Sequence, residues 1–208
     1  FAAPKIAYKD IGDSSPFHVD TEGSFMANTG YFIPSDEHDL AAYLNSKLLW
    51  FTYLNVSAQI RGGFVRFFSN HLGEMPIPNG PDSAKAELAV LSEKAHEAAK
   101  TRLALQTALM RRIPDLCPPE REPKLTTRLQ EWWTMSDFAT FRAEVKKVFK
   151  ADIPLADRSD WEDWINRDRA EIARLTAEIA QAEAQIDSIV YDLFDLTEDE
   201  IGLLEAAI

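Results

Sequence analysis

The feature that most constrains this chain is a helical repeat near its C-terminal end. Apolar residues recur there every three or four positions for about four heptads. The run comprises Ile165, Ile172, Leu175, Ile179, Ala182, Ile186, Ile189 and Leu193. An earlier run has the same spacing and comprises Leu88, Leu91, Ala95, Ala98, Leu105 and Leu109. Helices of this length must bury their apolar stripes, so the simplest arrangement pairs the two runs antiparallel.

An excursion, residues 113–158, separates the two helical runs. It has four prolines in its first eleven residues, and proline ends or interrupts helices. We expect one or two helices in it, around Trp132–Trp133 and over Phe138–Phe149. The patterns Ser159–Glu162 and Thr197–Glu200 are those of capping boxes, so they predict the starts of the long helix and of a short terminal helix.

The first eighty residues have a different character, since seven of the eight glycines lie there. Alternating apolar residues in Ile6–Tyr8, Phe17–Val19 and Phe25–Ile33 predict short strands, which Gly12, Gly23 and Gly30 break. One helix is expected to begin near Ser35 and to continue through Leu54. A turn at the glycine pair and an aromatic strand follow it, and a proline-rich stretch then closes the region. The two regions together predict an α+β fold. In it, a small mixed-sheet domain of residues 1–80 precedes long antiparallel coiled-coil-like helices of residues 81–208.

The formal net charge of −12 argues against nucleic-acid binding at face value, because phosphates are neutralised by Lys and Arg. Residues 1–80 carry five basic and eight acidic side chains, whereas residues 81–208 carry seventeen and twenty-six. Most of the acidity therefore belongs to the second region, where we interpret it as solvated helix faces. A parent protein with its own basic cleft would supply a positive field for DNA.

The sequence contains no recognisable catalytic, metal-binding or cofactor-binding pattern. The four histidines lack metal-ligand spacing, and the single Cys117 excludes an internal disulfide. Leu116–Glu120 has the double proline of an amino-methyltransferase motif, but it lacks the flanking polar and aromatic residues, so we interpret it as a loop. No apolar run is long enough to span a membrane.

An ordered set of segments carries a family resemblance. The set comprises Pro4–Tyr8, Asn28–Tyr31, Leu40–Phe51, Arg61–Phe67, Met75–Pro78, Ile186–Phe194, Leu196–Thr197 and Glu200–Ile201. In this combination the chain resembles the TaqI-like C-terminal specificity domain. That domain is found in Type IIG restriction–modification methylases and in related phage-defence adenine methyltransferases.

The resemblance implies target recognition of double-stranded DNA behind a catalytic domain that methylates adenine with S-adenosylmethionine. That methyltransferase domain would lie upstream in the same chain, because the start FAAPKIAYKD looks like an internal cut. The chain itself is expected to be non-catalytic and without cofactor, in the cytoplasm of a bacterium.

The expected DNA-binding residues are Arg61, Gly62, Gly63, Arg66, Lys47, Ser69 and Asn70. Arginine suits both phosphates and guanine edges, and we favour a phosphate contact for Arg61 while leaving the role of Arg66 open. The alternative for both is a surface position or an ion pair to Glu74. The main role of the two glycines would be to allow the backbone conformation of the turn. A secondary role would be to let the backbone come close to DNA.

The remaining site residues have structural alternatives as well. Lys47 would touch phosphate, whereas its neighbour Asn45 is expected to fix packing. Ser69 and Asn70 would read DNA or form a loop, and Ser69 stands where members of the family often carry a basic residue.

Two other functions stay open at this point. One is an enzyme of the same family that only methylates, as in phage exclusion. The other is an acidic coiled-coil module that binds proteins, which would have no need for Arg61 and Arg66 beside a glycine turn. The oligomeric state and the recognised base sequence are not encoded in any pattern that we find.

Overall fold

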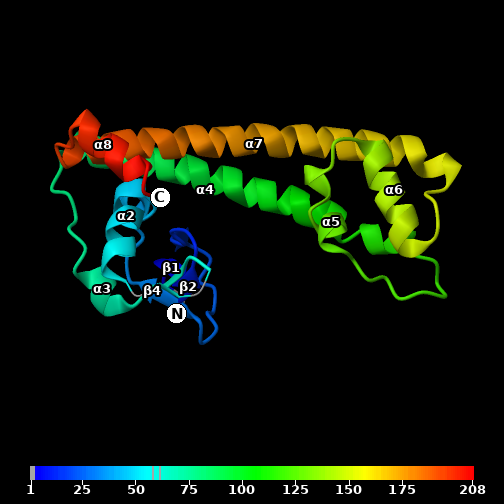
Figure 1. Cartoon of the computed structure of the whole chain (residues 1–208), viewed down its shortest axis with the longest axis horizontal. Coiled ribbons are helices and arrows are strands. Elements are labelled where there is room, and N and C mark those ends of the chain that lie inside the picture. Colours follow the sequence, from blue (N-terminus) through cyan, green and yellow to red (C-terminus); the bar gives the residue numbers. More distant parts are fainter. Residues whose placement is uncertain (1–2, 58, 61) are drawn as a thin grey trace. The chain divides into compact units, whose positions relative to one another are not determined.

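The computed structural model describes residues 3–57, 59–60 and 62–208 and divides into two compact units (Figure 1). Unit 1 comprises Phe1–His96 and Ala180–Ile208, and unit 2 comprises Glu97–Ile179. The long helices α4 (Asp82–Met110) and α7 (Arg158–Leu193) contribute to both units. The division at residue 80 that the sequence suggests therefore stays a prediction.

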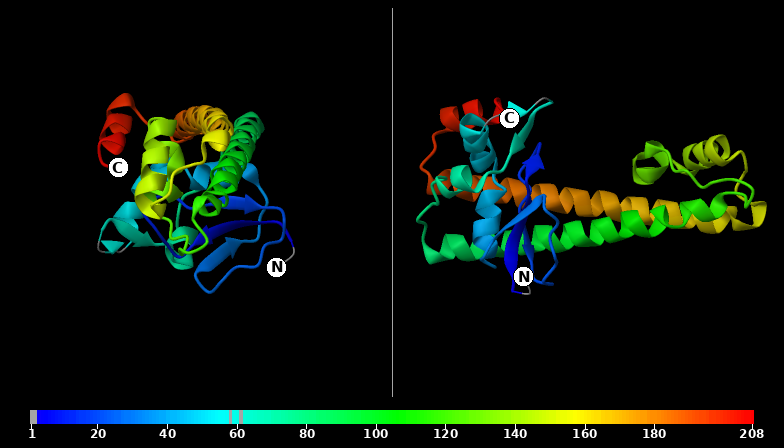
Figure 2. Two further views of the ribbon diagram at one scale, coloured as in Figure 1. Left: turned by 90° about the vertical axis from the view of Figure 1, so that its right-hand side faces the viewer. Right: turned by 90° about the horizontal axis from the view of Figure 1, so that it is seen from below.

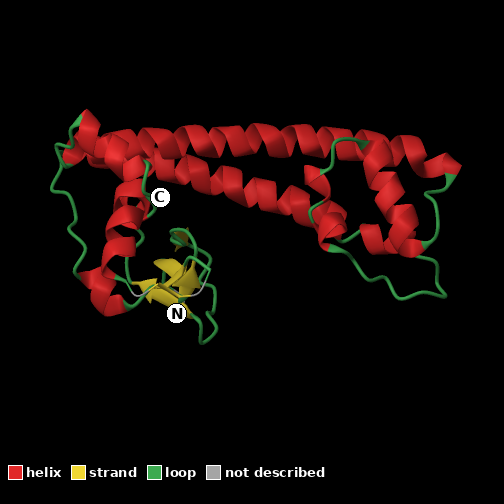
Figure 3. Ribbon diagram, in the orientation of Figure 1, coloured by secondary structure: helices red, strands yellow, loops and turns green. Residues whose placement is uncertain are grey.

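Unit 1 holds every strand among the described residues (Figure 3). The first sheet has the order β3-β1-β4, formed by His18–Asp20, Lys5–Lys9 and Gly30–Ile33. The second has the order β2-β6-β5, formed by Ile11–Gly12, Phe64–Arg66 and Gln59–Ile60. The α+β class is confirmed, although the strands form two antiparallel sheets where we expected one mixed sheet.

The chain passes from the first sheet to the second at Asp10. Its amide donates a hydrogen bond to the carbonyl of Thr29, beside the first sheet, and its carbonyl accepts one from the amide of Phe67, at the end of β6. Because one residue has partners on both sides, β1 and β2 join different sheets although they are nearly continuous in sequence.

The expected strand over Phe25–Ile33 is wrong in its first half, since β4 begins only at Gly30. The carboxylate of Asp20 accepts hydrogen bonds from the amides of Glu22 and Ser24, and Gly23 adopts a positive φ of 73°. This local turn holds the chain away from β1, so only the last residues of the segment pair with a strand.

The single helix expected from Ser35 to Leu54 is wrong, because two helices occupy this stretch. Helix α1 (His38–Leu44) ends before Asn45, and α2 (Lys47–Val56) begins after Ser46, whose hydroxyl accepts from the amide of Leu49. The Asn45 side chain both donates to and accepts from the backbone of Phe17. Its expected packing role is confirmed, and its bonds fix the break.

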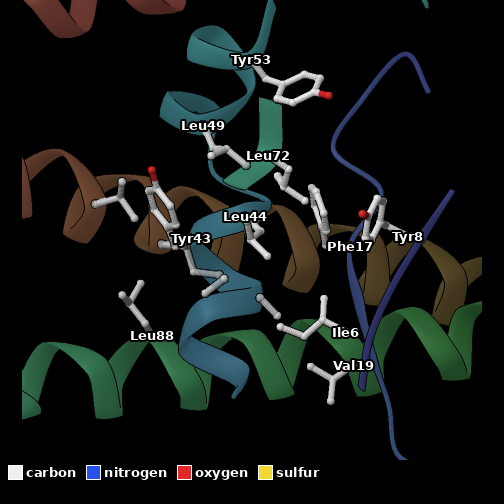
Figure 4. Packing of buried hydrophobic residues seen from close by; sticks show 14 of the residues in the cluster. Ile6, Tyr8, Phe17, Val19, Tyr43, Leu44, Leu49, Tyr53, Leu72 and Leu88 are labelled. Atoms are coloured by element: carbon white, nitrogen blue, oxygen red, sulfur yellow. The ribbon is translucent and has the colours of Figure 1, made fainter. Parts of the chain in front are cut away.

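The core of unit 1 joins both ends of the chain (Figure 4). Buried side chains of the sheets and of α1 and α2 pack against Leu88 and Leu91 of α4 and against Ala182, Ile186 and Val190 of α7. Helix α3 (Ser69–Gly73) adds Leu72. Helix α8 (Glu198–Glu205) starts at the predicted Thr197 capping box, which is confirmed.

In unit 2, α4 and α7 lie side by side (Figure 2). Ala98 packs with Leu175 and Ile179, whereas Leu109 clusters with Ile165 and Ile172, so the two helices are antiparallel here as predicted. The excursion contains the short helices and turns η1 (Ile113–Leu116), α5 (Thr127–Gln130), η2 (Trp132–Thr134), α6 (Phe138–Phe149) and η3 (Leu155–Asp157). The predicted helix over Phe138–Phe149 is confirmed. The four tryptophans of the unit pack in its core, namely Trp132, Trp133, Trp161 and Trp164.

The capping box expected at Ser159 is wrong. Helix α7 begins one residue earlier, at Arg158, directly after η3. Arg158 already has helical φ and ψ angles of −62° and −42°, so Ser159 lies inside the helix and cannot cap it.

The two units differ in net charge, and the difference is not visible along the sequence because unit 1 contains both the first and the last residues of the chain. Unit 2 carries fifteen basic and fifteen acidic residues, whereas unit 1 carries seven and nineteen. The whole net charge of −12 therefore belongs to unit 1, because the acidic end of α7 and α8 are part of it. Of the described helices, none combines the length and the apolar character that crossing a membrane requires.

Candidate nucleic-acid interface

Arg66 lies on β6, the central strand of the second sheet. Side chains along a strand point to alternate faces, and here Val65 and Phe67 are fully buried while Phe64 and Arg66 face outward. The ring of Phe67 stacks on Tyr53 with 4.7 Å between centroids, which anchors the inner face. The packing of these two inner residues therefore sends the Arg66 guanidinium toward solvent.

The backbone of Arg66 is held from helix α2. Its carbonyl accepts hydrogen bonds from the Tyr53 hydroxyl at 2.7 Å and from the Ser57 hydroxyl at 3.1 Å. Because the strand is fixed on one face by aromatic packing and at its carbonyl by two donors, the backbone of Arg66 and the face of the sheet from which its side chain leaves are set before any ligand binds.

The charge of Arg66 is not neutralised by a neighbour. Its guanidinium carbon lies 5.8 Å from the ring centroid of Phe68, a cation–π contact. Among the described residues no carboxylate is within ion-pair distance of it, and the alternative pairing with Glu74 is absent. Arg66 is thus a fixed, exposed cation that is available to an anion.

Partly exposed apolar side chains surround Arg66 on the outer face of the second sheet. Ile11 lies opposite Arg66 in the β2–β6 register, and Ile60 lies opposite Phe64 in the β5–β6 register. These three side chains and Phe68 are each about two-fifths exposed. Exposed apolar groups beside a cation are typical of an interaction surface, and apolar contacts also read the methyl group of thymine. We call Ile11, Ile60, Phe64, Arg66 and Phe68 the outer sheet face.

Gly62 and Gly63 form the turn between β5 and β6. Their φ angles are +91° and +83°, a region that other residues rarely adopt. A Cβ atom on Gly63 would meet nothing within 4 Å, and one on Gly62 would meet only the Phe64 ring. The backbone conformation therefore requires the glycines, and the outside of the turn is open. Arg61 lies outside the described residues.

Ser69 and Asn70 are exposed at the start of α3, directly after Phe68. They follow Phe68 directly in the chain, so they lie three and four positions after Arg66. Their contact with DNA stays a prediction.

Lys47 has a different position from the other expected site residues. Its ammonium lies 2.8 Å from a Glu205 carboxylate oxygen and 3.7 Å from one of Asp187. The hydrogen bond to Glu205 raises the pKa of Lys47, and burial raises the pKa of Asp187. Lys47 begins α2, whereas Ser57, which bonds to the Arg66 carbonyl, caps its other end, so about 15 Å of helix separates Lys47 from the residue that contacts the strand of Arg66.

Lys47 therefore connects α2 to α7 and α8, and a DNA contact for it stays a prediction.

The sequence did not predict Ile11, Ile60 and Phe68 as residues of the site. The signal for Phe68 and Phe64 was present in β6, where apolar residues occupy both faces of the strand and only one face can be core. Within residues 3–57, 59–60 and 62–208, no group of three His, Cys, Asp or Glu side chains is arranged to hold a metal ion.

Two family models match the chain. Residues 1–77 match the TaqI-like C-terminal specificity domain, and residues 81–190 match a domain of unknown function, DUF8810. The first match extends from β1 through α3 and contains the outer sheet face. The second match contains α4, the whole of unit 2 and most of α7. No curated protein matches the chain, and no solved structure matches it.

Proposed function

Since residues 1–77 form a TaqI-like C-terminal specificity domain and the chain belongs to the DUF8810 family, we propose that it selects the target sequence of an adenine-specific DNA methyltransferase. The specificity domain itself indicates DNA target recognition in a restriction–modification system. The finer assignment is that the enzyme is of Type IIG kind and acts in the bacterial cytoplasm.

The observation that carries this proposal is the outer sheet face. Arg66 is held by strand packing and by two hydroxyl donors to its carbonyl, with its charge free of carboxylate partners among the described residues. A fixed guanidinium between apolar groups suits a DNA groove, because arginine binds guanine edges and phosphates through two parallel donors.

The methyl donor S-adenosylmethionine belongs, in this proposal, to a catalytic domain that precedes the chain. The glycine pair of the chain closes a hairpin between two antiparallel strands and does not lie between a strand and a helix, as a cofactor loop does. These residues do not fit the cofactor, so the proposal gives the chain no part in methyl transfer itself.

A parent that methylates without cleaving is the alternative to a Type IIG enzyme, and cleavage assays on the whole enzyme distinguish the two.

The test is a binding-site selection. The full chain is incubated with a library of randomised duplexes, and the bound duplexes are sequenced. We expect enrichment of one short motif, and Arg66→Ala should weaken binding to that motif. If Arg66 reads a base, the loss is about 1–3 kcal/mol on the motif alone and one position becomes degenerate. If it contacts phosphate, all duplexes lose affinity alike.

A matched control is Lys85→Ala, which removes an exposed cation from α4 in the same unit and should leave the motif unchanged. Because surface substitutions change stability by about 0.5 kcal/mol or less, both variants should fold. Selection without any enriched motif, or an Arg66→Ala variant with unaltered affinity and motif, contradicts the proposed function.

One observation favours a second candidate, a module that binds proteins. Unit 1 carries twelve more acidic than basic residues, which suits a basic protein partner better than DNA. The same selection separates the two candidates, because a protein-binding module enriches no DNA motif.

A further inference from the structure

Helix α6 in unit 2 presents a face that contains only basic charges. Its buried side chains Phe138, Phe141, Val145 and Phe149 fix the orientation of the helix. The opposite side and the C-cap carry Arg142, Lys146, Lys147 and Lys150, which we call the α6 basic face. The single acidic residue of the helix, Glu144, is buried and lies outside this arc.

Around this face, each of two carboxylates forms ion pairs with more than one cation. Asp152 accepts two hydrogen bonds of 2.6 Å from Arg142, and it also lies 3.2 Å from Arg158 and 4.0 Å from Lys146. The Arg142 guanidinium lowers the pKa of Asp152, so this carboxylate stays charged.

Glu144 lies within ion-pair distance of Lys147 at 3.3 Å and of Arg128 at 3.9 Å. Two carboxylates therefore pair with five cations, and the exposed Lys150 at the C-cap adds a sixth positive charge to the face. The five are Arg128, Arg142, Lys146, Lys147 and Arg158.

The fold explains only part of this cluster. The two-pronged Arg142–Asp152 pair joins α6 to the segment after it, and Arg158 also donates to the carbonyl of Ile153. These bonds account for the two arginines. They do not account for Lys146 and Lys147, whose side chains are 67% and 71% exposed, or for the exposed Lys150. The dipole of α6 favours cations near its last turn, but it does not need three lysines with mutual repulsion.

From this charge excess we infer that the α6 basic face binds the phosphate backbone of double-stranded DNA without regard to sequence. The identity of the polyanion rests on the proposed function. Lysine acts as a compact point charge that suits phosphate, and residues four apart on a helix stand about 5–6 Å apart. Ala139 and Ala143 are exposed on the same helix, and their small side chains leave room beside the lysines.

A basic face on unit 2 also explains how a chain with a net charge of −12 can bind DNA. Unit 1, which contains the specificity domain, has seven basic and nineteen acidic residues, so its net charge opposes the approach of DNA. Unit 2 has no net charge, so a one-sided cluster of cations on it creates a local positive field. Recognition on one unit and backbone attraction on the other would divide the two tasks of binding.

The test measures how salt changes DNA affinity. Fluorescence anisotropy follows the full chain on a labelled random duplex between about 50 and 200 mM salt, a range over which backbone contacts are lost steeply. Each phosphate contact contributes about 0.9 to the slope of log affinity against log salt. The variant Lys146→Gln/Lys147→Gln should therefore have a slope lower by about 1.8, and the wild type should lose about tenfold more affinity than the variant over this range.

Two controls accompany this variant. Lys85→Gln/Arg174→Gln removes two exposed cations elsewhere, of which Arg174 already pairs with Glu171 and Glu178, and should keep the wild-type slope. Lys146→Arg/Lys147→Arg keeps both charges and should restore the slope. Circular dichroism melting of all variants checks that the fold is intact.

Equal slopes for the glutamine variant and the wild type overturn the inference, as does a wild-type chain that binds no duplex at about 50 mM salt. A variant that loses self-association while its DNA slope is unchanged also overturns it, because the face would then bind the acidic unit of a second copy. The proposed function fails separately. If the glutamine variant has a lower salt slope but the binding-site selection enriches no motif, sequence recognition is rejected. If a motif is enriched but the glutamine variant keeps the wild-type slope, only the role of the α6 basic face is rejected.

Discussion

The buried ion pair between Lys5 and Asp20 provides a quantitative test of the structure. The Lys5 ammonium lies 2.6 Å from the Asp20 carboxylate, and the two side chains are 2% and 5% exposed. The residues face each other in the β1–β3 register, and the amides of Glu22 and Ser24 also donate to the carboxylate. The hydrogen-bonded ammonium lowers the pKa of Asp20 to about 2, although burial opposes this shift.

Replacing Asp20 with Asn removes the charge and keeps the shape. The pKa of Asp20 falls from 3.8 to about 2 on folding, and at about 1.4 kcal/mol for each pKa unit we expect the free energy of unfolding at pH 7 to drop by about 2.5 kcal/mol. Since the folded pKa lies below the unfolded one, the contribution is complete above about pH 5 and disappears as the pH falls toward 2.

The assay is urea denaturation followed by circular dichroism between pH 7 and pH 2.5. Wild type and Asp20→Asn should differ at neutral pH and converge in acid. The double variant Lys5→Met/Asp20→Asn should recover part of the loss, because it also removes the buried ammonium whose carboxylate partner the Asp20→Asn substitution neutralises. Parallel pH profiles for wild type and Asp20→Asn would refute the reasoning, since they would show that the carboxylate gains nothing from its partner on folding.

Three further predictions follow from the structure and the sequence. Gly63→Ala places a Cβ in open space but at a φ of +83°, so it should lower the free energy of unfolding by about 1 kcal/mol in denaturation experiments; an unchanged value contradicts the turn conformation. Thr197→Ala removes the capping box of α8 and should cost about 1 kcal/mol, whereas Thr197→Ser should preserve stability. Glu205→Gln removes the closest charge partner of Lys47, and if Lys47 contacts phosphate, DNA affinity should rise at low salt; unchanged affinity assigns Lys47 to packing alone.

The parts of the fold that the sequence predicts are those determined by local patterns. Helices α4, α6 and α7 follow from apolar spacing and from prolines that end the runs, and the Thr197 capping box needs only four adjacent residues. The break between α1 and α2 could not be predicted in this way. It depends on bonds from Asn45 to the backbone of Phe17, twenty-eight positions away, and no local pattern contains that partner.

In the candidate site, too, the residues marked by local patterns could be predicted, and those that depend on distant partners could not. Arg66 and the glycine turn could be identified from sequence, because a glycine pair before an aromatic strand is a local signal. The partners of Lys47 could not, since Asp187 and Glu205 lie 140 and 158 positions further along the chain. The outer sheet face required the strand register, which pairs Ile11 with Arg66 only after folding.

The discontinuity of unit 1 sets the order in which the protein can fold during its synthesis. Residues 1–96 leave the ribosome before residues 97–208, yet their core also contains Ala182, Ile186 and Val190. The eighty-three residues of unit 2 must be translated in between, which takes about 4–17 s at typical elongation rates. Unit 2 is contiguous and can fold on emergence. Until the end of α7 has been synthesised, the nascent specificity domain lacks part of its core, so the apolar side chains that pack against Ala182, Ile186 and Val190 stay uncovered.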